Sequence, residues 1–182
     1  MSAIIVGIDN SEYRTTEYNA YDNDRFGKGE GKQYVDFIVE TLKPFIDKKY
    51  RTFKDPSNTI IAGSSLGGLI SYYAALNYPK VFGKCGVFSP AFWIAPEIDT
   101  LTMDKGRSVT GKIFFYIGEK EGKRYVDDME SLIDKLATIS DVDIYKVIDE
   151  EGQHNEAAWR KWFPEFMKWI LVTQYKLPVM ED

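Results

Sequence analysis

The stretch "IIAGSSLGGLISYYAALNYP", residues 60–79, contains two kinds of local structure on either side of a short glycine-rich segment. It begins with an apolar run that is typical of a buried strand, and its second half has the composition of a helix, which Pro79 ends. The segment between them, residues 63–67, matches the pattern Gly-x-Ser-x-Gly in the strand-to-helix context that this pattern requires. The stretch therefore predicts a sharp turn that projects the Ser65 hydroxyl from the end of a strand.

The two glycines of this turn have a steric explanation. A turn that lifts a serine hydroxyl off a strand brings strand and helix close together, so we expect Gly63 and Gly67 to occupy positions without room for a Cβ. Ser65 then lies at the N-terminus of a helix, where the helix dipole and free backbone N–H groups favour developing negative charge. The N–H group of Leu66 is the expected oxyanion donor.

A serine hydroxyl needs a neighbouring base before it reacts as a nucleophile. The chain has a single histidine, His154, in "VIDEEGQHNEAAW" between the last predicted strand and the last predicted helix. This order along the chain, serine before histidine with an acid between them, is the one that accompanies the pattern. We interpret Ser65 as the nucleophile and His154 as the general base; a surface or helix-capping role is the alternative for a lone histidine.

The acid that orients the imidazole should follow the preceding strand, in "FFYIGEKEGKRYVDD". This segment offers four carboxylates, at Glu119, Glu121, Asp127 and Asp128. Glu121 is the first choice because it lies three residues past the glycine that ends the strand, which is far enough for the loop to turn back. Glu119 is the second choice, and a solvated carboxylate is the alternative for both.

The remaining apolar runs predict an α/β fold with a mainly parallel sheet of about five strands and flanking helices, in one domain of residues 1–182. In such a sheet, ligands bind at the carboxyl ends of the strands. The expected strands cover residues 3–8, 59–63, 84–89, 111–118 and 141–148. The expected helices cover residues 34–46 with a bend at Pro44, 66–77, 126–136, and 159–170 with Pro164 inside.

Composition excludes several classes of function. The net charge is −5 with both signs interspersed, which predicts neither nucleic-acid nor anionic-membrane binding. One histidine and one cysteine, Cys85, cannot supply an imidazole-based zinc site, and no phosphate-binding loop or dinucleotide motif is present, so we expect no metal and no cofactor. No apolar run is long enough to span a bilayer, and residues 1–12 have neither a basic n-region nor a long apolar h-region, so a cytoplasmic protein is expected.

With these residues identified, the chain resembles the α/β-hydrolase-fold esterases related to enterochelin and other ferric-siderophore esterases and to feruloyl and acetyl esterases of carbohydrates. The resemblance covers nearly the whole chain. It lies in the segments "IIVGIDN", "RTTEY", "LKPFIDKKYRT", "NTIIAGSSLGGLISYYAALNYPKVFG" and "FSPAFW", followed by an acidic loop and the His154 segment. The resemblance implies a serine carboxylic-ester hydrolase that works through an acyl-enzyme on Ser65, with His154 as base and an acid near Glu121, although some siderophore esterases of this family work with serine and histidine alone.

The same resemblance implies an N-terminally shortened sheet, because the family usually has further strands before the one expected at residues 3–8. One of those strands is followed by a loop that donates the second oxyanion N–H, for which Asn10 is the expected substitute if the strand at residues 3–8 lies beside the nucleophile strand. A shortened sheet would leave part of an apolar face uncovered, so we expect a homodimer, and exchange of elements between the two copies is one way to form it.

The expected substrate is a small-molecule or carbohydrate-linked ester. Two aromatic loops, residues 11–31 and 89–93, could stack on an aromatic acyl group or a sugar, and Trp93 belongs to the second. Arg14 could pair with an anionic group of the substrate, although an exposed structural arginine is the alternative. A non-catalytic or weakly active hydrolase-fold protein that is stabilised by self-association is the competing interpretation of the whole chain.

Overall fold

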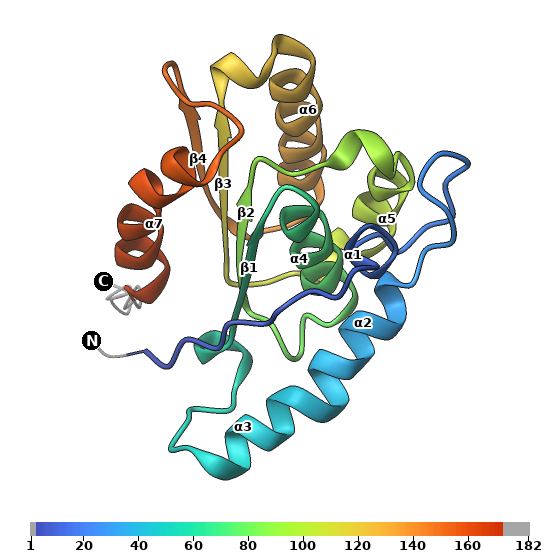
Figure 1. The fold of residues 1–182 in the computed structure, drawn as a ribbon. Helices are drawn as coiled ribbons and strands as arrows, with labels where there is room; N and C mark the ends of the chain where they lie inside the picture. Colours follow the sequence, from blue (N-terminus) through green and yellow to red (C-terminus); the bar gives the residue numbers. More distant parts are fainter. Residues whose placement is uncertain (1–2, 173–182) are drawn as a thin grey trace, which may run out of the picture.

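A computed structural model describes residues 3–172 and contains one four-stranded, fully parallel sheet in the order β1-β2-β3-β4 (Figure 1). The strands are β1 Ile60–Ser64, β2 Lys84–Phe88, β3 Lys112–Gly118 and β4 Asp143–Asp149. Each strand pairs with the next one along the chain, so every crossover moves by one position in the same direction. The carboxyl ends of all four strands therefore meet at one edge, where the α/β fold and its parallel sheet predict a site.

The helices are α1 Arg14–Glu17, α2 Gly31–Phe37, α3 Lys43–Lys49, α4 Leu66–Asn77, α5 Glu97–Lys105, α6 Lys123–Ile139 and α7 Glu156–Leu171. Short 3-10 turns lie at Pro56–Asn58 (η2), Phe92–Ile94 (η3), Gly106–Ser108 (η4) and Glu119–Glu121 (η5). None of the helices within residues 3–172 is long and apolar enough to cross a membrane. Helix α5 and the short α1 were not expected from the sequence, because their apolar residues are too few to form a clear stripe.

The bend expected near Pro44 appears as a π-helical turn, η1 Ile38–Leu42, between α2 and α3. Proline has no N–H to donate to the carbonyl of Glu40, four residues earlier, and its ring crowds that carbonyl. A wider turn directly before the proline accommodates the missing bond while the helix axis continues.

Two apolar layers cover the two faces of the sheet. Helices α4, α5 and α6 pack on one face, where alternate β3 residues such as Ile113 and Phe115 point. Helix α7 packs on the other face, where Phe166 and Ile170 contact Phe114 of β3 and its neighbours. Helix α2 lies outside α4 and forms a third, smaller cluster with it. The two central strands, β2 and β3, are therefore buried on both sides, as their continuous apolar runs predicted, whereas the outer strands β1 and β4 are only partly covered.

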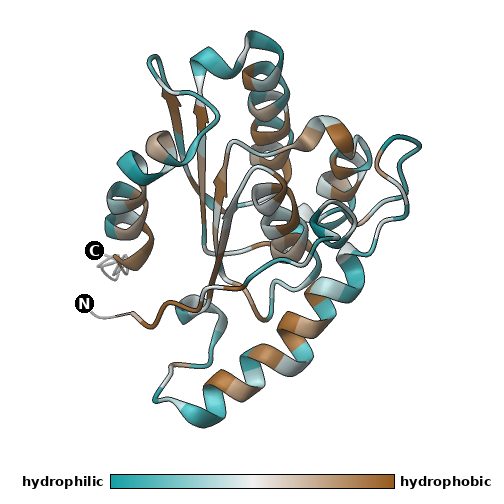
Figure 2. Ribbon diagram, in the orientation of Figure 1, coloured by the Kyte–Doolittle hydropathy of each residue, from teal (hydrophilic) through white to brown (hydrophobic). Residues whose placement is uncertain are grey.

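The strand expected at residues 3–8 is wrong, and the sheet has four strands within the described residues instead of about five. Residues 3–8 run outside the sheet as an extended segment without regular structure, and Figure 2 shows this apolar segment near the N-terminus as a coil that is not part of the sheet. Ile5 is 71% exposed. The sequence pattern supplied the right residues for a strand, but a strand also needs a neighbour whose backbone groups are in register.

Candidate active site

The turn at Ser65 connects β1 to α4 and has the strained geometry that the motif predicted. Ser65 has φ 59° and ψ −122°, a backbone conformation that residues other than glycine rarely adopt. A Cβ added to Gly63 would lie 2.5 Å from the carbonyl oxygen of Gly67, so Gly63 is sterically required. Gly67 differs from expectation, because a Cβ there would meet nothing within 4 Å. The second constrained glycine is Gly68, whose added Cβ would lie 2.9 Å from the Phe88 carbonyl oxygen.

Backbone hydrogen bonds hold this turn against the end of β2. The Ser65 N–H donates to the Phe88 carbonyl at 2.9 Å. The Ser65 carbonyl accepts from the N–H groups of Gly68 at 3.0 Å, Leu69 at 3.2 Å and Ala91 at 3.2 Å. Because both backbone groups of Ser65 are bonded, its side chain is directed away from the strand end by a rigid frame.

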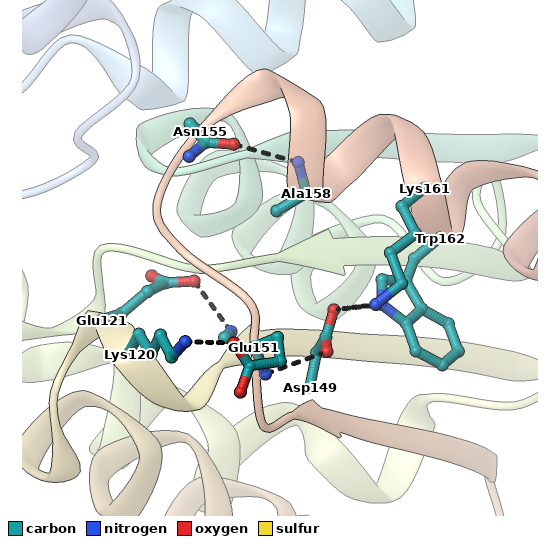
Figure 3. A network of polar contacts seen from close by, with 9 residues as sticks. Lys120, Glu121, Asp149, Glu151, Asn155, Ala158, Lys161 and Trp162 are labelled. Atoms are coloured by element: carbon teal, nitrogen blue, oxygen red, sulfur yellow. Dashed lines mark hydrogen bonds and ion pairs between the residues drawn. The ribbon is translucent and has the colours of Figure 1, made fainter.

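His154 lies in the loop between β4 and α7, and its Nε2 is 3.0 Å from Ser65 Oγ. The loop ends where Asn155 caps α7: the Ala158 N–H donates to Asn155 Oδ1 at 3.0 Å (Figure 3). The cap fixes the residue next to His154, which positions the loop. The imidazole side chain remains 46% exposed, so one side of it faces solvent.

Glu121 occupies the end of η5 and contacts the other ring nitrogen, with Oε2 2.6 Å from His154 Nδ1. Its Oε1 accepts the Gly118 N–H at 2.8 Å and the Ser89 hydroxyl at 2.6 Å. Burial alone would raise the pKa of Glu121, but hydrogen bonds from His154, Ser89 and Gly118 outweigh it and hold the pKa below its ordinary value. Glu119, the second choice from the sequence, is exposed at the start of the same turn.

A separate polar cluster lies at the end of β4. The Asp149 carboxylate accepts from Lys161 Nζ and from Trp162 Nε1, both at 2.8 Å (Figure 3). Burial alone would raise the pKa of Asp149, but these bonds outweigh it and lower the pKa. Lys120 pairs with Glu151 above this cluster. No three His, Cys, Asp or Glu side chains within residues 3–172 form a group that could hold a metal ion.

Leu66 is the first residue of α4, where a helix has no internal acceptor for its N–H. The other three predicted contact residues, Asn10, Arg14 and Trp93, make contacts of their own. The Asn10 amide donates to the Ser11 carbonyl, the Arg14 guanidinium lies 5.4 Å from the centre of the Tyr18 ring, and the half-exposed Trp93 packs against Phe26 and Tyr125. Within residues 3–172, the hydrogen bonds and ion pairs do not connect these three residues to Ser65 or His154. Their roles stay predictions.

A groove of about 570 Å³ runs along the outer side of β1. Its lining is largely apolar and comes from residues 3–8, from β1, from the α2–α3 helix and from α7. Asn10 and Arg14 line it, as do Ser64 and Gly67 on either side of the strained turn. The groove therefore connects the open edge of the sheet to the turn at Ser65.

Ser89 and Trp159 are part of this arrangement but were not singled out from the sequence. Ser89 directly follows β2, and its Oγ accepts the Trp159 Nε1–H at 2.8 Å. From the sequence, Trp159 is simply the first apolar residue of the helix expected at residues 159–170. A polar residue directly after a buried parallel strand was the available signal for Ser89, since such residues point to the carboxyl edge of the sheet.

A parallel α/β sheet, a strained serine turn and a histidine beside it define the class of α/β-hydrolase-like proteins. Within that class, the chain belongs to the esterase family: the family model described as "Putative esterase" matches residues 1–170. This membership agrees with the family that the sequence resembles.

Proteins similar to this chain support the same assignment. It is 26% identical to the YbbA protein of Bacillus subtilis over 92% of this chain and 72% of that protein. It is 33% identical to the iron(III) salmochelin esterase of Escherichia coli O6:H1 over 51% of this chain and 21% of that enzyme.

Two solved structures share the fold. The BES protein from Bacillus cereus superposes with a TM-score of 0.72 at 19% identity, over 93% of this chain and 67% of that one. The enterobactin esterase FES from Shigella flexneri superposes with a TM-score of 0.70 at 19% identity, over 88% of this chain and 41% of that one. The chain thus spans less than half the length of the Shigella enzyme.

Proposed function

We propose that the protein hydrolyses carboxylic esters through an acyl-enzyme on Ser65, with His154 as general base and Glu121 as the orienting acid. The contact between Ser65 Oγ and His154 Nε2 carries this proposal. It joins the only histidine of the chain to the strained serine across 89 residues of sequence. Membership of the esterase family supports the type of bond that is broken.

In the first half of the reaction, His154 Nε2 takes the proton from Ser65 Oγ as the oxygen attacks the ester carbonyl carbon. The resulting imidazolium returns that proton to the alkoxide oxygen, and the alcohol leaves while the acyl group stays on Ser65. In the second half, His154 takes a proton from water, the hydroxide attacks the acyl carbon, and the proton returns to Ser65 as the acid departs. Glu121 stabilises the imidazolium in both halves and keeps the proton on Nδ1.

Negative charge develops on the carbonyl oxygen in both halves. The N–H of Leu66 at the start of α4 is the proposed donor for it, and the helix N-terminus adds a favourable field. A second donor from Asn10 remains part of the proposal, since Asn10 lines the groove that reaches the turn.

The proposed substrate is an ester of an aromatic carboxylic acid with its apolar part in the β1 groove. The largely apolar lining of that groove supports such a group, and Arg14 at its wall would pair with an anionic substituent. A relative named as an endo-1,4-beta-xylanase/feruloyl esterase supports the same class. A feruloyl ester should therefore be hydrolysed with a higher kcat/KM than the corresponding acetyl ester.

The test compares two adjacent serines. Ser65→Ala should abolish both turnover of p-nitrophenyl esters and covalent labelling by a fluorophosphonate. Ser64→Ala, the matched control, removes a hydroxyl one residue away and should retain covalent labelling; any change in turnover should be confined to KM, because Ser64 lines the groove proposed to hold the substrate. Turnover by Ser65→Ala at the wild-type rate would refute the proposal, as would a folded wild-type protein that neither labels nor hydrolyses any ester.

A second candidate is a non-catalytic or weakly active protein that associates with itself, as a cytoplasmic homodimer. The exposed apolar residues Ile4, Ile5 and Val6 beside the open edge of β1 favour association. Sedimentation of the wild type and of Ile5→Ser tests it: a dimer that becomes a monomer in the variant supports association through this segment, and a monomeric wild type contradicts it.

A further inference from the structure

We propose that Ser89 and Trp159 are positioning residues for the hydrolysis proposed above: a hydrogen-bonded chain from Trp159 through Ser89 holds Glu121, and Glu121 holds His154. The inference rests on the proposed function but concerns two residues outside the expected set of serine, histidine and acid. Ser89 comes from the end of β2 and Trp159 from the first turn of α7. The chain therefore connects three separate elements of the fold, because Glu121 follows β3.

The direction of this chain is determined by the chemistry of its first member. An indole Nε1–H can only donate a hydrogen bond, so Trp159 Nε1–H is the donor and Ser89 Oγ the acceptor, at 2.8 Å. The Ser89 hydroxyl has one proton of its own, and the oxygen 2.6 Å away belongs to Glu121. That proton therefore points to the carboxylate, and every donor in the chain is directed toward the negative charge.

Both oxygens of Glu121 are accounted for by this arrangement. Oε1 accepts from Ser89 and from the Gly118 N–H, and Oε2 faces His154 Nδ1. The side chain is only 4% exposed, so water has little access to replace a lost donor. Two donors on Oε1 prevent rotation of the carboxylate, which leaves Oε2 directed at the imidazole.

Trp159 also contacts the base itself. Its ring lies edge-on to the His154 ring, with centroids 5.2 Å apart and planes at 85°. The His154 side chain is nearly half exposed, so a rigid neighbour on its inner side restricts the rotation that solvent would allow. One tryptophan thus restrains the base directly and the acid through Ser89.

The backbone supplies an independent observation. Within residues 3–172, the non-glycine residues with positive φ are Ser65, at 59°, and Ser89, at 43°. Strained conformations of this kind persist where the surrounding structure requires them and cluster at functional sites. Ser89 is held in its conformation by its N–H, which donates to the Tyr116 carbonyl at 2.7 Å, and it is 2% exposed. The strain directs its hydroxyl at Glu121.

Helix α7 contains its own comparison. Trp162, three residues after Trp159, also donates an indole N–H to a carboxylate, that of Asp149 at 2.8 Å. Trp162→Phe removes the same type of bond from the same helix without touching Glu121 or His154. It is therefore the matched control for Trp159→Phe.

The kinetic experiment uses Ser89→Ala, Trp159→Phe and Trp162→Phe with a p-nitrophenyl ester. Loss of positioning should lower kcat about tenfold in Ser89→Ala and Trp159→Phe with KM within about twofold, below the roughly 100-fold cost of a 1 Å misplacement. Trp162→Phe should keep kcat within about twofold. The proposal is wrong if Ser89→Ala keeps the wild-type kcat, or if Trp162→Phe lowers kcat as much as Trp159→Phe.

A second measurement requires no turnover. His154 is the only histidine, so labelling with [15N]histidine gives ring-nitrogen signals that need no assignment. The hydrogen bond to Glu121 should keep the neutral ring protonated at Nδ1. Ser89→Ala should shift the population toward the Nε2-protonated form, and an unchanged population in a folded variant contradicts the proposal. If the wild type hydrolyses no ester, the proposed function fails while this result still decides the positioning.

A double substitution separates positioning from general support of the fold. In a Glu121→Ala background, Ser89→Ala should change kcat less than twofold, because the residue through which it acts is gone. A further tenfold loss in that background would show that Ser89 acts by another route, and the proposal would be withdrawn.

Discussion

Two short segments of this chain have nearly the same local sequence and different structures. Residues 3–8 read "AIIVGI" and residues 59–64 read "TIIAGS". The second forms β1 and pairs in register with β2, while the first runs as an exposed segment beside the groove. β-branched residues fit a pleated, half-buried surface, but the strand itself is made by the hydrogen bonds of a neighbour.

The difference between the segments also appears in what their glycines contact. Gly7 has nothing within 4 Å of an added Cβ, whereas Gly63 faces the backbone of Gly67. Half-buried Ile61 packs between two core clusters, while Ile5 is exposed to solvent. The same residue types should therefore contribute very differently to the free energy of unfolding in the two segments.

The largest effect is expected from the glycines. Gly63→Ala should destabilise the fold by about 3 kcal/mol, because the new Cβ can only be accommodated by moving backbone. It should also lower esterase turnover by roughly 100-fold through displacement of Ser65. Gly7→Ala is the control and should leave the free energy of unfolding and kcat unchanged, with any effect confined to KM because residues 3–8 line the groove; urea titration and ester kinetics measure these quantities. Equal effects at the two glycines would show that the segments are not distinct.

A smaller effect is expected from the isoleucines. Ile61→Ala should lower the free energy of unfolding by about 2 kcal/mol, since it leaves a cavity between two clusters. Ile5→Ala should change that free energy by less than about 0.5 kcal/mol, as is usual for a surface position. Thermal melts followed by circular dichroism measure both. A loss at Ile5 that matches the loss at Ile61 would mean that residues 3–8 are buried in solution.

Acid should destabilise the carboxyl edge of the sheet, where Glu121 and Asp149 lie. At mildly acidic pH, its effect on the free energy of unfolding should be smaller than the effects of the glycine and isoleucine substitutions. The folded pKa values of Glu121 and Asp149 lie below their ordinary values of 4.5 and 3.8. Their stabilising contribution is therefore complete above those values and is lost as the pH falls through the lowered, folded ones.

Cleavage by pepsin at different pH values reports the loss of structure in residues 3–8 and in residues 59–64 in one experiment. It should cut residues 3–8 at every pH below 5, and residues 59–64 only at the lower pH where the fold is lost. In Glu121→Gln, the onset of cleavage at residues 59–64 should depend less on pH. Cleavage of both segments over the same pH range would refute the distinction.

Most of the regular elements could be predicted because they rest on local patterns. The turn at Ser65, the helix after it and the strands at residues 84–88 and 112–118 all follow from apolar runs bounded by breakers. Membership of the esterase family agrees with the resemblance in the same central segment. The prediction of a strand at residues 3–8 was wrong, because this segment has the residue types of a strand but no neighbouring strand to pair with.

Only those features of the site that depend on the order of residues along the chain could be predicted. Ser65 and His154 follow from a motif and from the presence of one histidine, whereas Glu121 ranked above Glu119 only by its position in the loop. Which of two nearby carboxylates turns back to the imidazole depends on the path of η5. Ser89 and Trp159 were missed because they come from different elements and meet only after packing.

The sequence by itself determined the alternation of strands and helices, the serine turn and the order of its polar residues, since each of these depends on neighbours along the chain. Tertiary structure alone decided which apolar segment became a strand, which carboxylate reached the histidine and which side chains support that carboxylate. Those outcomes depend on distances between segments that only the packed sheet and its helices define.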